Sequence, residues 1–245
     1  LMTLKLFNKQ LEIFKQRGED ELLSIAFELE FNFIYVLASM EQKGIKIDVK
    51  LLKEYKDRSL IYLNELTQNI YEACGESFNI NSPKQLGVIL FEKLGLASSK
   101  KTKTGYSTDE SVLESLKNEH KVVPLLLKYR EAFKLHSTYI EPLLELGLKD
   151  SENRVFSSFL HTGTTTGRLS SKNPNLQNIP VGAFSDIQIR RAFIAQEGYK
   201  LVGVDYSQIE LRLLAHFSKD EALVNAFKQD LDIHLQTAIK IFGED

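Results

Sequence analysis

One long amphipathic segment constrains the fold of this chain more than any other feature. From Asp48 to Cys74, apolar side chains recur at the spacing of one helix face. They are Leu52, Tyr55, Leu63, Leu66, Ile70 and Ala73. Asp48 suits the N-cap, Gly75 suits the stop, and a helix of this length extends for about 35–40 Å. Because a compact helical core needs less length, we expect this helix to pair with another one in an arm.

The rest of the first half also predicts helices. A helical apolar pattern fills Asp20–Gln42 and ends before Gly44, a typical C-terminal glycine. Ser82 followed by Pro83 is a clear helix start. The other expected elements are a short extended step at Ile45–Ile47, helices that end near Leu94 and Asn118, and a long helix over 122–146 that bends near Pro142.

The sequence changes character after about Gly147. Alternation over Arg154–Phe159 predicts a strand, and Thr162–Pro180 is a long polar segment rich in Thr, Ser, Asn, Gly and Pro, which predicts a loop. Tyr199–Val204 has the pattern of a buried strand. Three short helices are expected over 207–217, 218–227 and 232–242. The prediction is therefore helical before about 148 and mixed α+β after it.

Charge and composition exclude some classes of protein and leave others open. The 31 basic and 33 acidic residues give a net charge of −2, so bulk charge does not indicate a nucleic-acid partner. Cys74 is the single cysteine, which excludes an internal disulfide and fits a reducing compartment. We find no run of about 18 apolar residues for a membrane span and no signal peptide. Both ends look cut, so we expect a piece of a longer protein.

Asp205 is the most informative single residue. It follows the predicted strand and precedes a helix, where a carboxylate is held rigidly and can bind a metal. The alternative is an ordinary turn or N-cap aspartate. Ser207 and Glu210 have the spacing of a capping box, which would explain Glu210 without any function.

Other polar residues also have two interpretations. His234 stands in the first turn of a predicted helix, where a phosphate could bind, or it is a solvated surface histidine. Arg168 lies among small hydroxyl residues and next to a glycine, which allows a groove to approach, and Asn175, Gln177 and Asn178 follow it. The alternative is a polar Ω-type loop. Three lysines, Lys100, Lys101 and Lys103, are a weak phosphate-binding signal in what is by default a solvated turn.

Two long motifs together resemble the bacterial branch of the family A DNA polymerases. One runs from Thr166-Gly167-Arg168 through Asn173 to Pro180, and the other from Val204-Asp205-Tyr206 to Arg212, followed by Asp232-Ile233-His234. The similarity extends to Ser82–Leu86 and Lys101–Thr108. It covers nearly the whole chain. The resemblance implies an enzyme that adds deoxynucleotides to a primer 3′ end with two Mg²⁺ ions.

The resemblance also implies roles for individual residues. Asp205 would be the catalytic metal-binding carboxylate, with the Tyr206 carbonyl in the metal shell. Glu210 would reject a ribose 2′-OH, His234 would contact the incoming phosphates, and Ser207 and Gln208 would join them at the nucleotide. The implied DNA contacts are Arg168 with Thr164 and Thr166 at the minor groove, Asn175, Gln177 and Asn178 along the primer–template, and Lys100, Lys101 and Lys103 at the thumb tip.

The implied fold is α+β and predominantly α. It has a long-helix thumb arm and an incomplete antiparallel palm sheet with flanking helices. The implied divisions are residues 1–27, the end of an exonuclease-like domain; 28–147, the thumb; and 148–245, the first part of the palm. The family's second carboxylate and its fingers helix are not found in this sequence. We therefore expect the chain alone to be inactive.

The implied partners are primer–template DNA and deoxynucleoside triphosphates. The intact enzyme would be a cytoplasmic bacterial monomer without a membrane partner. A helical DNA-binding module without catalysis is the main alternative. A related nuclease or phage-type polymerase is a third reading.

Overall fold

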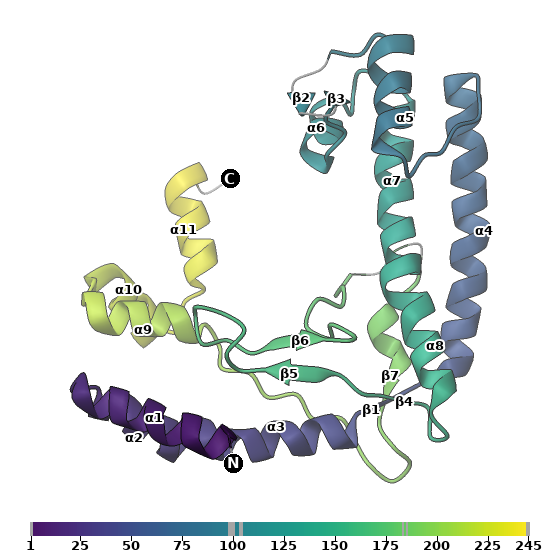
Figure 1. Cartoon of the computed structure of the whole chain (residues 1–245). Coiled ribbons are helices and arrows are strands. Elements are labelled where there is room, and N and C mark those ends of the chain that lie inside the picture. Colours follow the sequence, from purple (N-terminus) through teal and green to yellow (C-terminus); the bar gives the residue numbers. More distant parts are fainter. Residues whose placement is uncertain (1, 98–100, 103–104, 183, 185, 244–245) are drawn as a thin grey trace. The chain divides into compact units, whose positions relative to one another are not determined.

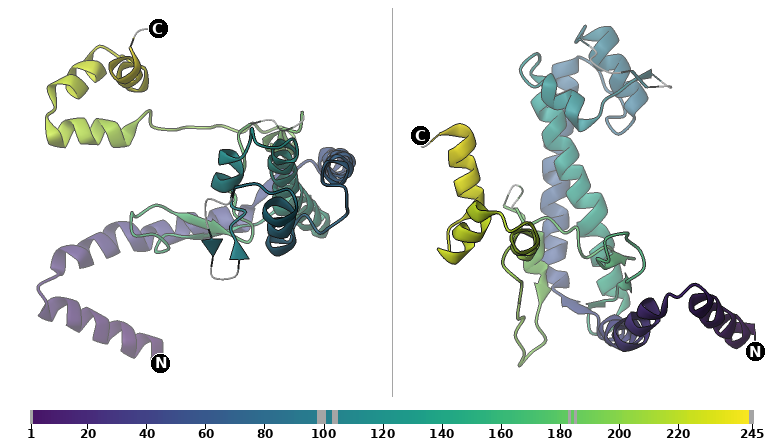
Figure 2. Two further views of the ribbon diagram at one scale, coloured as in Figure 1. Left: turned by 90° about the horizontal axis from the view of Figure 1, so that it is seen from above. Right: turned by 90° about the vertical axis from the view of Figure 1, so that its left-hand side faces the viewer.

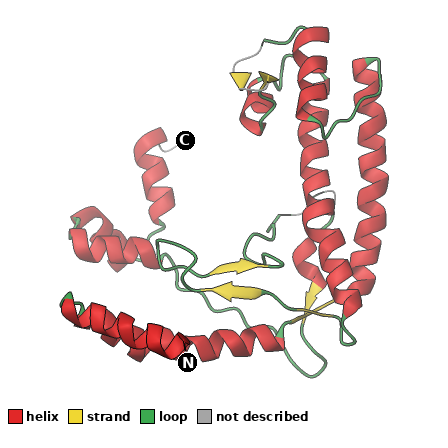
Figure 3. Ribbon diagram, viewed as in Figure 1, coloured by secondary structure: helices red, strands yellow, loops and turns green. Residues whose placement is uncertain are grey.

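The structure is a computed structural model that describes residues 2–97, 101–102, 105–182, 184 and 186–243 (Figure 1). For Lys101, Thr102 and Lys240 it describes the backbone alone. The chain divides into two compact units, Leu1–Tyr199 (unit 1) and Lys200–Asp245 (unit 2). Most elements are helices and the strands are short and antiparallel (Figure 3), which confirms the predominantly helical α+β class.

The expected arm is present in unit 1. α4 (Val49–Cys74) lies alongside a helix that runs through α7 (Val122–Lys134), η3 (Leu135–Ile140) and α8 (Glu141–Lys149) (Figures 1 and 2). Asp48 caps α4 as expected, because its Oδ1 accepts the N–H of Leu51 at 2.9 Å. The helix expected over 122–146 continues through Pro142, which lies in the first turn of α8, and the π-helical segment η3 ends at Ile140 just before it.

Two clusters of buried side chains hold the arm together. Near the middle and far end of α4, Leu63, Leu66 and Ile70 pack against Leu86, Leu90, Leu113, Val122, Val123 and Leu126. Near its start, Leu52 and Tyr55 pack against Leu135, Ile140, Leu143 and Val155. Burying one such leucine contributes about 1.5–3 kcal/mol. The apolar stripe of α4 therefore faces its partner helix along its length.

The far end of the arm carries several short elements. These are α5 (Pro83–Gly87), η2 (Val88–Lys93), β2 (Lys101–Thr102), β3 (Gly105–Tyr106) and α6 (Glu110–Ser115). Ser82 caps α5 as expected, since its Oγ accepts the N–H of Gln85 at 3.4 Å. Arg130 of α7 donates to Thr108 Oγ1 at 3.2 Å and so fastens this end to the arm.

Two small antiparallel sheets lie at the base of the arm. One has the order β4-β1-β7, built from β1 (Ile45–Ile47), β4 (Arg154–Val155) and β7 (Phe193–Ile194). Its register pairs Ile45 with Val155 and Ile47 with Phe193. The other pairs β5 (Ser158–Leu160) with β6 (Ser170–Lys172). The strand expected over Arg154–Phe159 is thus two strands, and η4 (Ile189–Ala192) precedes β7.

The N-terminal helices expose most of their apolar side chains. α1 (Met2–Gln16) is followed by α2 (Asp20–Ile25), η1 (Ala26–Glu30) and α3 (Phe31–Lys43), and Leu37 is the one buried residue that the structure describes on them. The last three form one helix, Asp20–Lys43, which is long and apolar enough to cross a membrane by length and composition alone. Our expectation of no such segment is corrected to that extent. Glu28 and Glu30 lie within it, and charges are costly in a bilayer.

A buried polar cluster joins α4 to η3 and α8. Ser59 Oγ donates to the carbonyl of Lys56 at 2.8 Å, and His136 Nδ1 lies 2.8 Å from the same Oγ. Burial lowers the pKa of His136. Lys56 Nζ donates to Glu141 Oε1 at 2.9 Å, and this bond lowers the pKa of Glu141.

Unit 2 contains the three expected short helices, α9 (Ile209–Ser218), α10 (Glu221–Lys228) and α11 (Ile233–Phe242). The buried strand predicted over Tyr199–Val204 is wrong, because these residues have no regular structure. Val202 is 83% exposed and Val204 is 92% exposed. A buried strand needs neighbouring strands for its N–H and C=O groups, and among the described strands none pairs with this segment.

Candidate nucleic-acid interface

The residues with predicted functions are distributed over both units. The arginine loop, which we define as residues 161–169 between β5 and β6, and the segment 173–180 after β6 belong to unit 1. Asp205, Glu210 and His234 belong to unit 2. The contacts of these residues are therefore described separately for unit 1 and for unit 2.

The arginine loop presents its polar side chains to solvent. Residues 162–168 are exposed, and Gly167 adopts φ 75°, a left-handed conformation that favours glycine. Thr164 Oγ1 donates to the carbonyl of Arg168 at 2.7 Å, and Thr166 Oγ1 lies 3.4 Å from Thr164 Oγ1. The two threonines predicted to contact DNA therefore also form hydrogen bonds that shape the loop around Arg168.

In the segment after β6, the side-chain amides of Gln177 and Asn175 form hydrogen bonds within the protein. Gln177 Oε1 accepts the N–H of Ser171 at 3.1 Å, and its Nε2 donates to the carbonyl of Leu169 at 2.9 Å. Asn175 Oδ1 accepts the N–H of Gln177 at 2.9 Å. Gln177 therefore joins this segment to the arginine loop, which agrees with the polar-loop alternative for this residue, and its predicted DNA contact stays a prediction.

A surface recess brings this segment together with the arm. It has a volume of about 550 Å³ and its lining includes Lys134, Thr138, Asn175 and Asn178. All four side chains are exposed. Tyr139 fixes the loop to the helix, because its hydroxyl donates to the carbonyl of Asn178 at 2.7 Å. Besides the apolar Leu143, Pro174 and Ile179, the lining of this recess thus contains one lysine, two amides and the hydroxyl-bearing Thr138 and Tyr139. No acidic side chain is among the described residues that line it.

Sequence reasoning missed Lys134 and Thr138. They stand four residues apart, so they share one face of the helix formed by α7 and η3. That spacing was readable, but one lysine on a helix is an ordinary surface residue. Only the packing of the loop beside them distinguishes this pair.

The lysine cluster predicted at the tip of the arm cannot be assessed. Lys100 and Lys103 lie outside the described residues, and Lys101 is described only by its backbone in β2. Its predicted phosphate contacts stay a prediction.

Asp205 lies on an exposed segment at the start of unit 2. Tyr206, next to it, is 80% exposed. Gln208 is the N-cap of α9 with φ 51°, and its side chain makes no capping hydrogen bond, so the helix starts one residue later than a cap at Ser207 would place it. Glu210 stands in the first turn of α9.

The start of α9 is held by Arg212. Its Nε donates to the carbonyl of Ser207 at 3.0 Å, and its guanidinium lies 4.5 Å from the ring centre of Phe227 in α10. This cation–π contact joins the first two helices of unit 2. It also fixes the backbone immediately after Asp205 and Tyr206 to the helix that follows.

His234 occupies the expected helix start. It is exposed in the first turn of α11, and Asp232 Oδ1 accepts the N–H groups of His234 and Leu235 at 2.8 and 3.1 Å. The N-cap carboxylate therefore already satisfies two of the free amides that a phosphate would use. The imidazole ring remains available at the surface for another contact.

Metal ligands are incomplete in the described part of the chain. It contains no group of three or more His, Cys, Asp or Glu side chains that could hold an ion. Mg²⁺ is commonly bound through one or two carboxylates together with waters and substrate phosphates. Asp205 fits one position in such a site, and the rest of the ligands would come from elsewhere.

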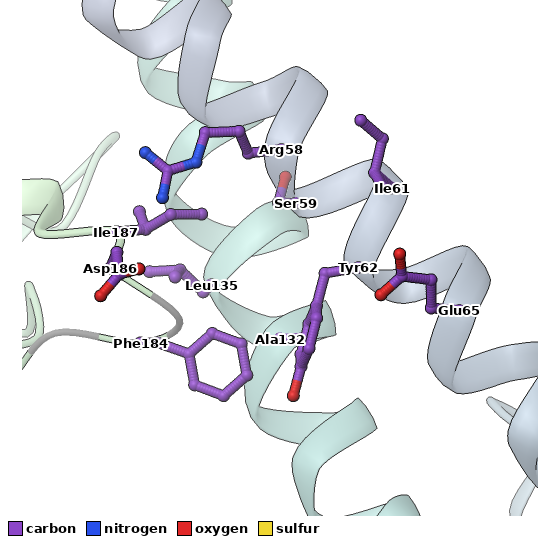
Figure 4. Close-up of a pocket in the computed structure, with 10 residues that line it drawn as sticks. All are labelled: Arg58, Ser59, Ile61, Tyr62, Glu65, Ala132, Leu135, Phe184, Asp186 and Ile187. Atoms are coloured by element: carbon purple, nitrogen blue, oxygen red, sulfur yellow. The ribbon is translucent and has the colours of Figure 1, made fainter.

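A second cavity contains none of the predicted site residues in the described part of the chain. It measures about 230 Å³ and lies between α4, the helix of α7 and η3, and the segment around Phe184 and Ile187 (Figure 4). Tyr62 and Phe184 meet edge to face across it, with ring centres 5.5 Å apart. Packing of that segment onto the arm explains these contacts.

Comparison with known proteins identifies close relatives. The chain is 47% identical over 246 residues to DNA polymerase I of Helicobacter pylori (strain J99), covering 100% of this chain and 27% of the relative. It is 49% identical over 236 residues to DNA polymerase I of Bacillus subtilis (strain 168), covering 96% and 25%. The chain thus spans about a quarter of the length of these curated relatives.

A solved structure agrees with this similarity. The POL domain of Pol1 from M. smegmatis, in complex with DNA primer-template and dNTP, aligns with a TM-score of 0.84 and 36% sequence identity. The alignment covers 95% of this chain and 41% of that one. The family defined as DNA polymerase family A matches residues 49–245, which include the arm, the arginine loop and Asp205. The resemblance seen in the two motifs is thereby confirmed, and the chain belongs to the family A DNA polymerases.

Proposed function

We propose that this chain is the DNA-gripping and first-carboxylate part of a bacterial DNA-directed DNA polymerase that extends primer 3′ ends with deoxynucleotides in replication and repair. The recess shared by Lys134, Thr138, Asn175 and Asn178 carries the proposal. A cation and amide groups suit an anionic backbone and the polar edge of a groove, and among the described residues no carboxylate lines the recess on the side of Asn175 and Asn178. The M. smegmatis polymerase domain, which was solved with primer-template and dNTP, supports this assignment.

The chemistry of this interface fits a polymerase because it does not depend on sequence. The minor groove presents acceptors at nearly equivalent positions in every base pair. A guanidinium such as that of Arg168 can donate to those acceptors and thereby test the shape of the terminal pair. Asn175, Gln177 and Asn178 would line the primer–template path, with Gln177 acting mainly through the loop that it holds.

Asp205 would supply one carboxylate for the two Mg²⁺ ions of the intact enzyme, and the carbonyl of Tyr206 would complete part of the shell. The ions would neutralise charge on the transferred phosphoryl group. Glu210 would exclude a ribose 2′-OH, and His234 would meet the triphosphate, with Ser207 and Gln208 beside the nucleotide. These assignments follow from the family motif and the exposed positions of the side chains.

The intact protein would act in the bacterial cytoplasm as a monomer. Its thumb would correspond to residues 28–147 and the start of its palm to 148–245, with residues 1–27 ending an exonuclease-like domain. The chain by itself would bind duplex DNA without extending a primer, because it offers one candidate catalytic carboxylate.

A salt titration of duplex binding with matched lysine variants tests the proposal. Lys134→Ala should weaken binding and lower the slope of log K against log salt concentration by up to about 0.9, the value for one lost phosphate contact. Lys128→Ala is the control, because Lys128 is also exposed on α7 and, like Lys134, lines a recess with Glu110, Glu114 and Glu131, but it does not line the recess with Asn175 and Asn178. Equal effects of both substitutions would argue against the recess as the DNA site.

Asp205→Ala distinguishes DNA binding from catalysis, which are measured in two separate assays. The variant chain should bind the duplex like the unmodified chain. In the full-length protein, the same substitution should abolish nucleotide incorporation. Unchanged incorporation would remove Asp205 from the catalytic centre and favour a DNA-binding module without catalysis.

A further inference from the structure

We propose that Glu41 is a positioning residue for the arginine loop. Its carboxylate, near the end of α3, accepts the N–H of Phe159 in β5 at 2.6 Å. β5 leads directly into the loop that carries Arg168. The inference rests on the proposed contact between Arg168 and the minor groove, and it names the residue that keeps this contact in place.

The hydrogen bonds of the small sheet explain why an external anchor matters. Phe159 and Ser171 are register partners in the β5–β6 pair. Neither N–H donates to the carbonyl of its register partner: Glu41 Oε1 accepts the N–H of Phe159, and Gln177 Oε1 accepts that of Ser171. This is the arrangement of a non-hydrogen-bonded pair in an antiparallel ladder, whose free groups point outward.

Each edge of this two-stranded sheet is therefore held by one side chain. An isolated pair of strands is marginally stable in water, so its position depends on such external contacts. Gln177 belongs to the loop that follows β6, and it moves with the hairpin. Glu41 belongs to a separate helix. Of the two anchors, it alone ties the hairpin to another part of unit 1.

The helix end that carries Glu41 is itself fixed. Arg154 of β4 donates from one guanidinium nitrogen to the carbonyl of Lys43 at 3.1 Å and from another to Gln196 Oε1 at 2.8 Å. Glu41 precedes Lys43 by two residues. A second contact lies along the same interface, where His161 Nε2 is 3.7 Å from Glu30 Oε2. Because that pair is longer, Glu41 provides the stronger attachment.

The shape of the loop transmits the position of β5 to the arginine. Thr164 Oγ1 holds the carbonyl of Arg168, and Gln177 Nε2 holds that of Leu169. The loop therefore follows its strands when they move. A hydrogen bond to an ionised carboxylate is about twice as strong as a neutral one, which suits an anchor for an exposed loop.

Binding to a duplex that lacks one minor-groove acceptor tests this role. The probe is a primer–template whose terminal primer base is a 3-deazapurine, compared with the normal purine. The unmodified chain should prefer the normal duplex by about tenfold, the size of one good groove contact. Arg168→Ala should remove this preference, which tests the proposed contact separately.

Glu41→Ala should reduce the preference to less than about twofold while the affinity for the deaza duplex stays unchanged. A merely destabilised fold would lower both affinities. Glu41→Gln keeps an acceptor oxygen and should restore most of the preference, and Gln42→Ala, an exposed neighbour on α3, should leave it intact. In an Arg168→Ala background, Glu41→Ala should add nothing.

The outcomes separate the two proposals. A preference that survives Glu41→Ala but is lost in Arg168→Ala overturns the positioning role and leaves the groove contact standing. A preference that survives Arg168→Ala overturns the proposed contact, and with it the role of Glu41. Equal loss in Glu41→Gln and Glu41→Ala would also overturn the inference, because the acceptor would then be irrelevant.

Discussion

The arm of unit 1 and the helices of unit 2 have similar local sequence signals, yet they differ in how many apolar side chains they bury. α4 buries six residues along one face, and the opposite helix fills that stripe with leucines and valines. In the described part of unit 2, Ala215 and Ile233 are the buried apolar residues. Leu214 and Phe217 of α9 are 52% and 77% exposed.

This difference shows that helix formation and helix burial have separate causes. Caps and periodicity are sufficient for the helices of both regions, because they act within a few residues. Burial of a helix face requires a second apolar surface, and in the arm α7 and its neighbours provide that surface for α4. In unit 2 the residues proposed to act on the nucleotide lie where caps and the Arg212–Phe227 contact provide most of the order.

A core substitution should give the largest contrast between the two regions. Leu126→Ala removes a fully buried side chain of α7 and should lower the free energy of unfolding by about 3 kcal/mol. Leu214→Ala, on the exposed face of α9, should change it by less than about 0.5 kcal/mol. Urea unfolding followed by circular dichroism measures both values. Similar losses would mean that unit 2 buries Leu214 in solution.

Removing a helix cap should have an intermediate effect, which spreads over the whole arm in unit 1 but stays within one helix in unit 2. Asp48→Ala removes the cap of α4 and should destabilise the arm by about 1 kcal/mol in urea unfolding. Asp232→Ala removes the equivalent bond in α11, but we expect faster hydrogen exchange only within that helix. Exchange followed by mass spectrometry locates the change. Faster exchange in α4 after Asp232→Ala would contradict this expectation.

The buried histidine should give the smallest effect, and only in the arm. The pKa of His136 is lowered in the fold, so below its ordinary value of 6.5 the unfolded chain binds the proton more readily. Stability should therefore be highest above pH 6.5 and decline as the pH falls, until the folded form also protonates. The pKa of Glu141 is lowered from 4.5, so its contribution is lost only at more acidic pH.

The free energy of unfolding, measured at about pH 7.5 and about pH 5.5, reports the histidine contribution, because ordinary carboxyl groups stay ionised across that interval. His136→Gln should reduce the difference between the two conditions. His234→Gln, an exposed site in unit 2, serves as the control and should leave it unchanged. An unchanged difference in His136→Gln would show that burial of His136 has no thermodynamic consequence, and an equal reduction in both variants would show that the effect does not depend on burial.

Predictions from sequence were most accurate where the signal was local. Asp48 and Gly75 bound α4 as expected, and Ser82 begins α5. The strand predicted over Tyr199–Val204 is wrong because a strand depends on partners elsewhere in the chain. In the same segment α9 takes Gln208 as its N-cap, in a left-handed conformation, where the capping-box spacing indicated Ser207.

The candidate site was accessible to sequence reasoning only in part. Arg168 and Asp205 stand in long motifs, and their family is confirmed. Their individual roles stay predictions. Lys134 carries no motif, and the structure places it beside Asn175 in one recess. The anchoring roles of Glu41 and Gln177 could not be predicted, because neither residue has a sequence pattern that identifies the amide it accepts from.

The sequence by itself determined the helices of this protein, most of their ends, and the family to which it belongs. These depend on caps, on apolar spacing and on contiguous motifs, all of which act over short distances along the chain. Tertiary structure decided which polar groups come together: Lys134 and Asn175 line one recess, and Glu41 accepts the backbone N–H of Phe159. Residues 118 positions apart form that last bond, and only the packed arrangement of helix and hairpin brings them within reach.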